Sequence, residues 1–221
     1  MKLGNVFNKL FGVAYIKNLA TSIERRAFII EQCNSIDLEY KIVPAINGID
    51  LHDSSFTIQH GRFLLTYPSS AGFIGNQITS YEILNKAIEQ DLDNFIMLDD
   101  DCVFNHAVNI SEESLIELEK NLPSDWDVII LGDMGGDIVT NESILYHKCS
   151  EHYEAAGSHG IAVSKRVFTE MQELLAGRQW LGDGVIGRLI DIGKNVYKIY
   201  PSLCIQDRSL FSDINKLHHT S

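Results

Sequence analysis

The sequence has little cysteine and no long apolar run. Its four cysteines, Cys33, Cys102, Cys149 and Cys204, are widely scattered, and no two of them form a C-x-x-C pair. This spacing indicates neither a zinc ribbon nor a disulfide framework, so we expect a reducing, cytoplasmic setting. No apolar run approaches the ~20 residues that a membrane-spanning helix needs.

Basic residues are also scarce. The chain has 18 Lys and Arg against 30 Asp and Glu, which gives a formal net charge of -12. Because phosphate backbones are held mainly by Lys and Arg, this balance argues against nucleic acid as a partner. An anionic ligand would need local positive charge. A chain of 221 residues is long enough for one sizeable core, and we predict a single domain over residues 1–221.

Residues 1–11 are amphipathic. Leu3, Val6, Phe7 and Leu10 recur at helical spacing with lysines between them, but the stretch lacks the continuous apolar core of a signal peptide. We expect it to pack on the domain. The alternative is a weak peripheral contact with the inner face of a membrane.

Strand and helix patterns alternate along the chain. Apolar runs predict strands at residues 12–19, 39–45, 94–98, 125–133 and 160–164, and helical periodicity predicts helices at residues 21–35, 75–90, 111–122 and 164–177. Residues 49–71 lack periodicity and are predicted as a loop or irregular insert, and residues 206–221 as a C-terminal tail. A strand that is apolar at every position suggests a sheet covered on both faces. We therefore predict an α/β fold with a mostly parallel central sheet flanked by helices.

The stretch "NFIMLDDDCVF" places three aspartates, Asp99, Asp100 and Asp101, directly after an apolar strand. Ligands of such sheets bind outside the carboxyl ends of the strands. Side chains alternate along an extended segment, so Asp99 and Asp101 should point to one side and form a two-carboxylate D-x-D claw. Mg²⁺ and Mn²⁺ prefer oxygen ligands and commonly bridge carboxylates to phosphates. The triplet therefore predicts a metal site; the alternative is a solvated acidic turn.

A second chemistry uses the same pattern. In aspartyl-phosphate phosphatases the first Asp of a strand-end D-x-D is the nucleophile and the second is a general acid. Such a motif normally lies near the start of its domain and is followed by Thr, whereas this one lies in the middle of the chain and is followed by "CVF". The phosphatase or hydrolase interpretation is the weaker one.

Several segments, in order, resemble glycosyltransferase family 25, which includes bacterial lipooligosaccharide glycosyltransferases and collagen galactosyltransferases. The segments are "YIKNLATSIERR", "VPAING", "GFIGNQITSYEIL", "IMLDDDCVF", "DWDVIILG", "GSHGIAVSKR" and "PSLCIQDRSLFSDI". Together they span about residues 14 to 214. Where the family pattern reads G-x-x-G-C-x-x-S-H, this chain has Asn76, Thr79 and Ser80, and Asp99 replaces a Glu. These departures indicate a divergent member, and they leave open a non-catalytic carbohydrate-binding descendant.

The resemblance implies a single-domain nucleotide-sugar transferase of the GT-A type. The implied reaction is transfer of a hexose, galactose or glucose, from a UDP-sugar to a glycan acceptor such as lipooligosaccharide, with inversion. The implied cofactor is Mn²⁺ or Mg²⁺, with Asp99 and Asp101 as metal ligands. Asp99 could also contact the ribose, and Asp100 could orient either group.

The resemblance also implies donor-binding residues. Asn18 belongs to the matched Asn-Leu turn, and Arg25 and Arg26 lie at the start of the first helix, where backbone N–H groups add to an anion site. The arginines could instead pair with surface glutamates. His159, just before a strand, could line the site or bind metal, or be structural, and Gln206 could reach the metal or the donor. All five are candidates for contact with the nucleotide sugar.

Inversion requires a base that deprotonates the acceptor hydroxyl. Asp183 follows Trp180, an aromatic ring that could stack on a sugar, and it is our first candidate; the alternative role for Asp183 is that of a helix N-cap. Asp133, which ends "IILGD", is the second candidate.

Overall fold

The computed structural model describes residues 2–51, 57–60, 63–66, 70–104, 110–132, 144–156, 159–177 and 182–207. Its centre is a seven-stranded sheet in the order β2-β1-β5-β9-β7-β10-β8. The strands of this sheet are β1 (Ala14–Asn18), β2 (Tyr40–Pro44), β5 (Asn94–Asp99), β7 (Val128–Gly132), β8 (Leu145–Lys148), β9 (Gly160–Ser164) and β10 (Val196–Tyr200). Five of them run in one direction, and β8 and β9 run against them. The predicted mostly parallel α/β sheet is confirmed.

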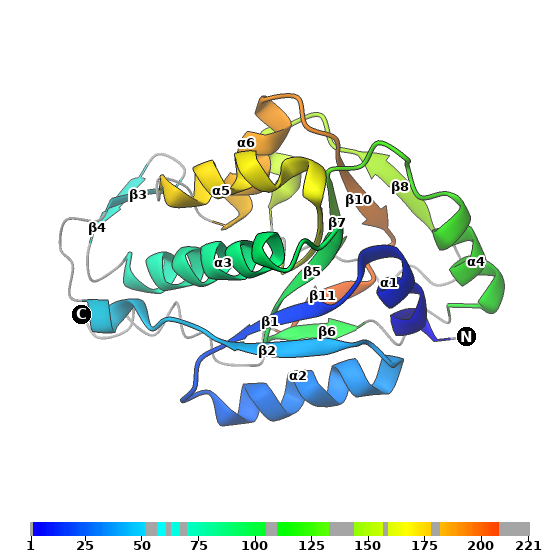
Figure 1. Cartoon of the computed structure of the whole chain (residues 1–221), viewed down its shortest axis with the longest axis horizontal. Coiled ribbons are helices and arrows are strands. Elements are labelled where there is room, and N and C mark those ends of the chain that lie inside the picture. The colour runs from blue at the N-terminus through cyan, green and yellow to red at the C-terminus, as the bar shows by residue number, and fades with distance from the viewer. Residues whose placement is uncertain are drawn as a thin grey trace.

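Helices cover both faces of the sheet (Figure 1). The helices α1 (Leu3–Phe11), α2 (Ile23–Ile36) and α4 (Glu112–Lys120) contribute to one apolar cluster, and α3 (Ala71–Glu89), α5 (Phe168–Ala176) and α6 (Gly182–Asp191) contribute to the other. The apolar residues of β5 alternate between the two clusters, and Phe95 to Leu98 are all buried. This is why the strand reads as apolar at every position.

The amphipathic start of the chain packs inside the domain. Phe7 and Phe11 of α1 are fully buried, and the ring of Phe11 meets that of Trp126 edge to face with centroids 5.5 Å apart. The apolar face of α1 is thus used within the fold, which favours packing over the membrane contact considered from the sequence. Within the described residues, no helix is both long and apolar enough to cross a membrane.

Smaller elements extend the framework. They are the 3-10 helices η1 (Gly48–Leu51), η2 (His152–Ala155) and η3 (Lys165–Val167), the antiparallel hairpin β3 (Thr57–His60) and β4 (Phe63–Thr66), and the antiparallel pair β6 (Cys102–Phe104) and β11 (Cys204–Gln206). The hairpin and η1 lie where the sequence predicted an irregular insert. The β6–β11 pair brings Gln206, which was predicted to lie in a tail, beside the residues that follow β5.

Candidate active site

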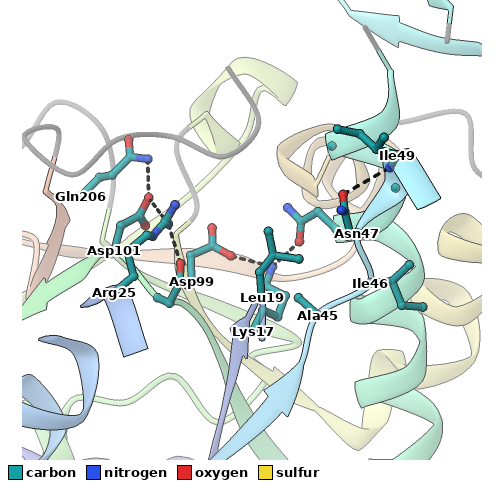
Figure 2. Close-up of a pocket in the computed structure, with 14 residues that line it drawn as sticks. Lys17, Leu19, Arg25, Ala45, Ile46, Asn47, Ile49, Asp99, Asp101 and Gln206 are labelled. Carbon is teal, nitrogen blue, oxygen red and sulfur yellow. Dashed lines mark hydrogen bonds and ion pairs between the residues drawn. The ribbon is translucent and has the colours of Figure 1, made fainter. Parts of the chain in front are cut away.

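The acidic triplet lies at the carboxyl end of β5 and lines a cleft (Figure 2). Asp99 is the last residue of the strand, and Asp100 and Asp101 form the turn that leads into β6. Asp100 and Asp101 are each only 6% exposed. A solvated turn would leave these carboxylates open to water, so their burial argues against this interpretation for Asp100 and Asp101.

The chain supplies its own cations to the triplet. Lys17 is the register partner of Asp99 on the adjacent parallel strand β1, and its Nζ lies 2.8 Å from Asp99 Oδ1. Nη2 of Arg25, in the first turn of α2, lies 2.5 Å from Asp100 Oδ1 and 2.9 Å from Asp101 Oδ2. Two basic side chains therefore face three carboxylates, and a formal charge of -1 remains when all three are ionised.

Asp100 is held in place by Asn18, the last residue of β1. Asn18 is buried and donates a hydrogen bond from Nδ2 to Asp100 Oδ2 over 2.6 Å. Burial raises the pKa of the Asp100 carboxyl to about 6, against the opposing effects of Arg25 and of the bond from Asn18. Asn18 thus positions the triplet, and it is not among the described residues that line the cleft.

Asp101 is fixed by β11. Gln206 donates from Nε2 to Asp101 Oδ2 over 3.0 Å, and the N–H of Asp207 donates to the backbone oxygen of Asp101 over 2.9 Å. Burial, and then the neighbouring charge of Asp99, raise the pKa of the Asp101 carboxyl. Its second oxygen, Oδ1, is buried and accepts no hydrogen bond from the part of the chain that the structure describes.

Asp99, Asp101 and His159 form a candidate metal centre. Each offers one ligand atom, and these atoms lie within 4.8 Å of one another. His159 is 8% exposed, and its ring nitrogen Nε2 has no hydrogen-bond partner among the described residues. A buried polar atom without a partner is costly, and here two of them belong to one small group. The two carboxylates suit the predicted Mn²⁺ or Mg²⁺. An imidazole nitrogen beside them is compatible with Mn²⁺, so the donor set fits a divalent cation of this kind.

The opposite wall of the cleft is the backbone that follows β2. Residues 45–49 line it and lie against the first turns of α3, where Gly48 and Gly75 meet closely. A Cβ at Gly75 would come within 2.2 Å of Ile46 O, and one at Gly48 within 1.7 Å of Ala71 O. Neither position has room for a side chain. Glycine therefore allows this segment to approach the helix and sets the position of the wall.

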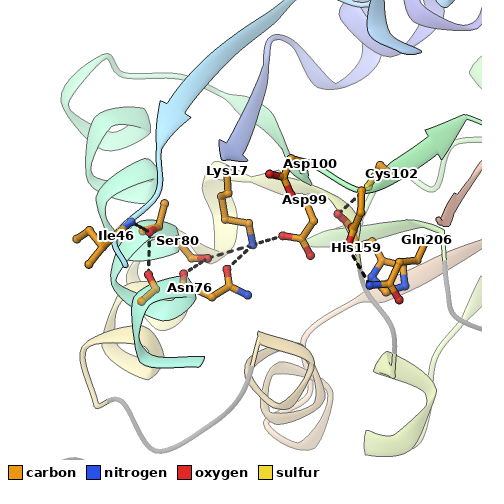
Figure 3. Close-up of polar contacts among 12 residues, drawn as sticks. Lys17, Ile46, Asn76, Ser80, Asp99, Asp100, Cys102, His159 and Gln206 are labelled. Atoms are coloured by element: carbon orange, nitrogen blue, oxygen red, sulfur yellow. Dashed lines mark hydrogen bonds and ion pairs between the residues drawn. The ribbon is translucent and has the colours of Figure 1, made fainter. Parts of the chain in front are cut away.

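A polar network joins the two walls (Figure 3). Lys17 Nζ donates to Asn76 Oδ1 over 2.8 Å and to Ser80 Oγ over 3.5 Å, both on α3. Thr79, one turn after Gly75, accepts a hydrogen bond from the Ile46 N–H over 2.9 Å. Asn76 and Ser80 thus connect α3 to Lys17, and Thr79 connects α3 to the segment that follows β2.

Other predicted residues lie elsewhere. Arg26 is exposed and Asp183 is half-buried, and neither belongs to the cleft lining as far as the structure describes it. Asp183 lies in the first turn of α6, close to the helix start that its alternative role as an N-cap requires. Asp133 and Trp180 lie outside the described residues. The roles of these four residues stay predictions.

Sequence reasoning did not single out Lys17. The available signal was a lysine inside an otherwise apolar first strand, a position at which a charge needs a partner. Its partner could not be read from the sequence, because the pairing depends on the parallel register of β1 with β5.

Comparison with known proteins finds relatives among glycosyltransferases. Procollagen galactosyltransferase 2 of Homo sapiens is 25% identical over 132 residues, covering 55% of this chain and 21% of the relative. The Mus musculus protein of the same name is 24% identical over 129 residues, with the same coverage. The chain therefore spans about a fifth of the length of these curated relatives.

Two solved structures show a distant likeness. One is a glycosyltransferase involved in the glycosylation of the major capsid of PBCV-1, with a TM-score of 0.49, 12% identity and coverage of 90% of this chain and 93% of the other. The second is A197 from STIV, with a TM-score of 0.45, 14% identity and coverage of 91% and 86%. Neither likeness is close enough to add to the argument.

The model of glycosyltransferase family 25, described as an LPS biosynthesis protein, matches residues 11–155. The match covers β1, the cleft wall, the start of α3 and the acidic triplet, and it extends over more than half of the chain. The chain therefore belongs to glycosyltransferase family 25, a family of glycosyltransferases.

Proposed function

We propose that the chain is a divalent-metal-dependent transferase that moves a hexose from a UDP-sugar to a hydroxyl of a glycan acceptor, with inversion. The observation that carries the proposal is the group of Asp99, Asp101 and His159 beside the cleft, in which Asp101 and His159 each have one buried polar atom without a hydrogen-bond partner among the described residues. The name of the galactosyltransferase relatives supports galactose as the donor sugar, with glucose as the alternative. The family description supports a lipopolysaccharide-type acceptor such as lipooligosaccharide.

The charges around the cleft suit a diphosphate once a metal is present. The triplet with Lys17 and Arg25 carries a formal charge of -1, and a divalent cation would change this to +1. An acidic protein could thereby hold the anionic end of a nucleotide sugar without a large basic patch. Asp99, Asp101 and His159 would hold the ion, which supplies Lewis-acid stabilisation of the leaving diphosphate.

The remaining residues of the site position these groups. Asn18 and Arg25 hold Asp100 in place. Gln206 holds Oδ2 of Asp101, which fixes the orientation of the carboxylate and leaves Oδ1 available to a metal. Preorganised groups need no rearrangement when charge develops on the diphosphate. The segment 45–49 forms the wall against which the nucleotide would lie. For the acceptor base, Asp183 remains our first proposal and Asp133 the second.

Thermal denaturation with UDP, with Mn²⁺ and with both tests this function. A ligand that binds only the native state raises the midpoint, by about 2.7 kcal/mol of stability at one hundred times its Kd. At ~2–4 °C per kcal/mol for a chain of this size, the rise is about 5–10 °C. We expect the largest rise for UDP and Mn²⁺ together.

The variant Asp101→Asn should lose the Mn²⁺-dependent part of the rise. Asp93→Asn is the matched control, because Asp93 is exposed and lies before β5, away from the cleft. No shift with UDP and Mn²⁺ in the folded wild-type chain would contradict the transferase assignment. Release of inorganic phosphate from sugar phosphates without UDP would support the phosphatase alternative instead.

A further inference from the structure

Lys17 lies where the metal centre, the cleft and α3 meet. Its side chain is 13% exposed and lines the cleft, and Asp99 is the one carboxylate that pairs with it within the described residues. On its other side Lys17 donates to Asn76 and Ser80. An ammonium on a side chain with so little exposure needs compensation, and one ion pair with two neutral acceptors supplies it.

The carboxylate of Asp99 is shared between two cation positions. One of its oxygens pairs with Lys17 Nζ at 2.8 Å, and the same carboxylate contributes a ligand atom to the group with Asp101 and His159. Figure 3 shows the Asp99 carboxylate between Lys17 on one side and His159 on the other. A metal bound by Asp99 would therefore lie near the ammonium, and two like charges repel across such a short distance.

We propose that Lys17 is the cation that a divalent metal displaces from Asp99, and that the released ammonium then binds the diphosphate of the donor. This inference rests on the proposed function and assigns to Lys17 a role in the order of binding. Asn76 and Ser80 provide neutral acceptors that keep the ammonium at the cleft when Asp99 turns to the metal. Lysine suits such an exchange because its ammonium is a point charge on a flexible stem.

The local sequence agrees with this role. Ser80 Oγ lies 3.5 Å from Lys17 Nζ. Serine is small and carries no positive charge. Lys17 therefore has room beside Ser80 and supplies the positive charge at this point. These three side chains therefore act together: Lys17 on β1 carries the positive charge, and Asn76 and Ser80 on α3 accept hydrogen bonds from it.

Titrations of Mn²⁺, and of UDP at saturating Mn²⁺, into wild type and Lys17→Met test the proposal. Removing the competing ammonium should tighten Mn²⁺ binding at least about tenfold, and removing a phosphate ligand should weaken UDP binding at least about tenfold. Lys41→Met is the matched control: it removes one positive charge from the neighbouring strand, where Lys41 is exposed and outside the cleft lining. Lys17→Gln, which keeps a hydrogen-bonding group, is the second variant should Lys17→Met fail to fold.

Two results overturn the proposal. One is a Mn²⁺ affinity of the Lys17 variants equal to that of Lys41→Met, and the other is UDP affinity unchanged from wild type. If the wild-type chain binds both ligands while the Lys17 variants bind them equally well, only the role of Lys17 is lost. A wild-type chain that binds neither Mn²⁺ nor UDP contradicts the proposed function itself, and the inference falls with it.

Discussion

The close contact between α3 and the cleft wall gives a sharp prediction for Gly75→Ala. The added Cβ would lie 2.2 Å from Ile46 O and 2.8 Å from Gly48 N, and real Cβ atoms do not come closer than 3.0 Å to such atoms. The segment must therefore move by at least 0.8 Å, the difference between 3.0 and 2.2 Å. Because residues 45–49 form one wall of the cleft, the substitution displaces the proposed nucleotide site.

The expected cost in stability is small. Overpacking costs about 1–3 kcal/mol, but alanine is better than glycine inside a helix by about 1 kcal/mol, so the net loss is about 0–2 kcal/mol. At ~2–4 °C per kcal/mol the midpoint falls by at most about 8 °C, and the chain stays folded. UDP affinity at saturating Mn²⁺ should fall at least about tenfold, whereas Mn²⁺ affinity alone should not change, since Asp99, Asp101 and His159 lie on other elements.

Calorimetric titration of both ligands measures this difference. Gly177→Ala is the matched control, because a Cβ there meets its nearest atoms at 3.5 Å, an ordinary contact, and the backbone is right-handed helical. Gly75→Ala protein that binds UDP as tightly as wild type would refute the assignment of residues 45–49 to the nucleotide site. A loss of Mn²⁺ binding as well would show that the two walls do not act separately.

Two further substitutions test the framework. Thr79→Val leaves the N–H of Ile46 without its acceptor and should cost about 1–3 kcal/mol in chemical denaturation, whereas Thr79→Ser, which keeps the hydroxyl, should cost less; equal losses would contradict this role of the hydroxyl. Burial raises the pKa of Glu154, but two backbone N–H groups and the His147 ring together lower it, to about 2. The resulting stability, about 1–2 kcal/mol after allowance for the surface position of the His147 pair, is present above pH 4.5 and lost as pH falls toward 2. The difference in unfolding free energy between wild type and Glu154→Gln should therefore disappear between pH 5 and pH 2. For Glu173→Gln, a control at an exposed position, the difference from wild type should stay constant over this range. A Glu154→Gln difference that does not change with pH would contradict the stabilising role of the Glu154 carboxylate.

The acidic triplet could be predicted because its signal is local. An apolar run of strand length followed by D-x-D defines both a strand end and a ligand pattern, and the structure places Asp99 and Asp101 together in one group. His159 could be named as a candidate because it precedes an apolar strand. The closeness of His159 to the triplet could not be predicted, because it depends on β9 running antiparallel beside β5.

Strand direction and register account for most of what the sequence did not reveal. The apolar pattern of β9 is the same whichever way the strand runs, so its reversal inside a mostly parallel sheet carries no local signal. Lys17 and Asp99 are 82 positions apart and meet through the register of β1 with β5. Similarly, Gln206 reaches Asp101 through the short β6–β11 pair, which periodicity over three residues cannot predict.

The central claim is that His159 completes a metal centre with Asp99 and Asp101. Electron paramagnetic resonance counts free Mn²⁺ directly, and titration of wild type should show one ion bound per chain. His159→Ala should lose most of that affinity, and His147→Ala, at a largely exposed histidine outside the group, should keep it. Folded wild-type protein that leaves all Mn²⁺ free, or a His159→Ala variant that binds the ion as tightly as wild type, would contradict the account.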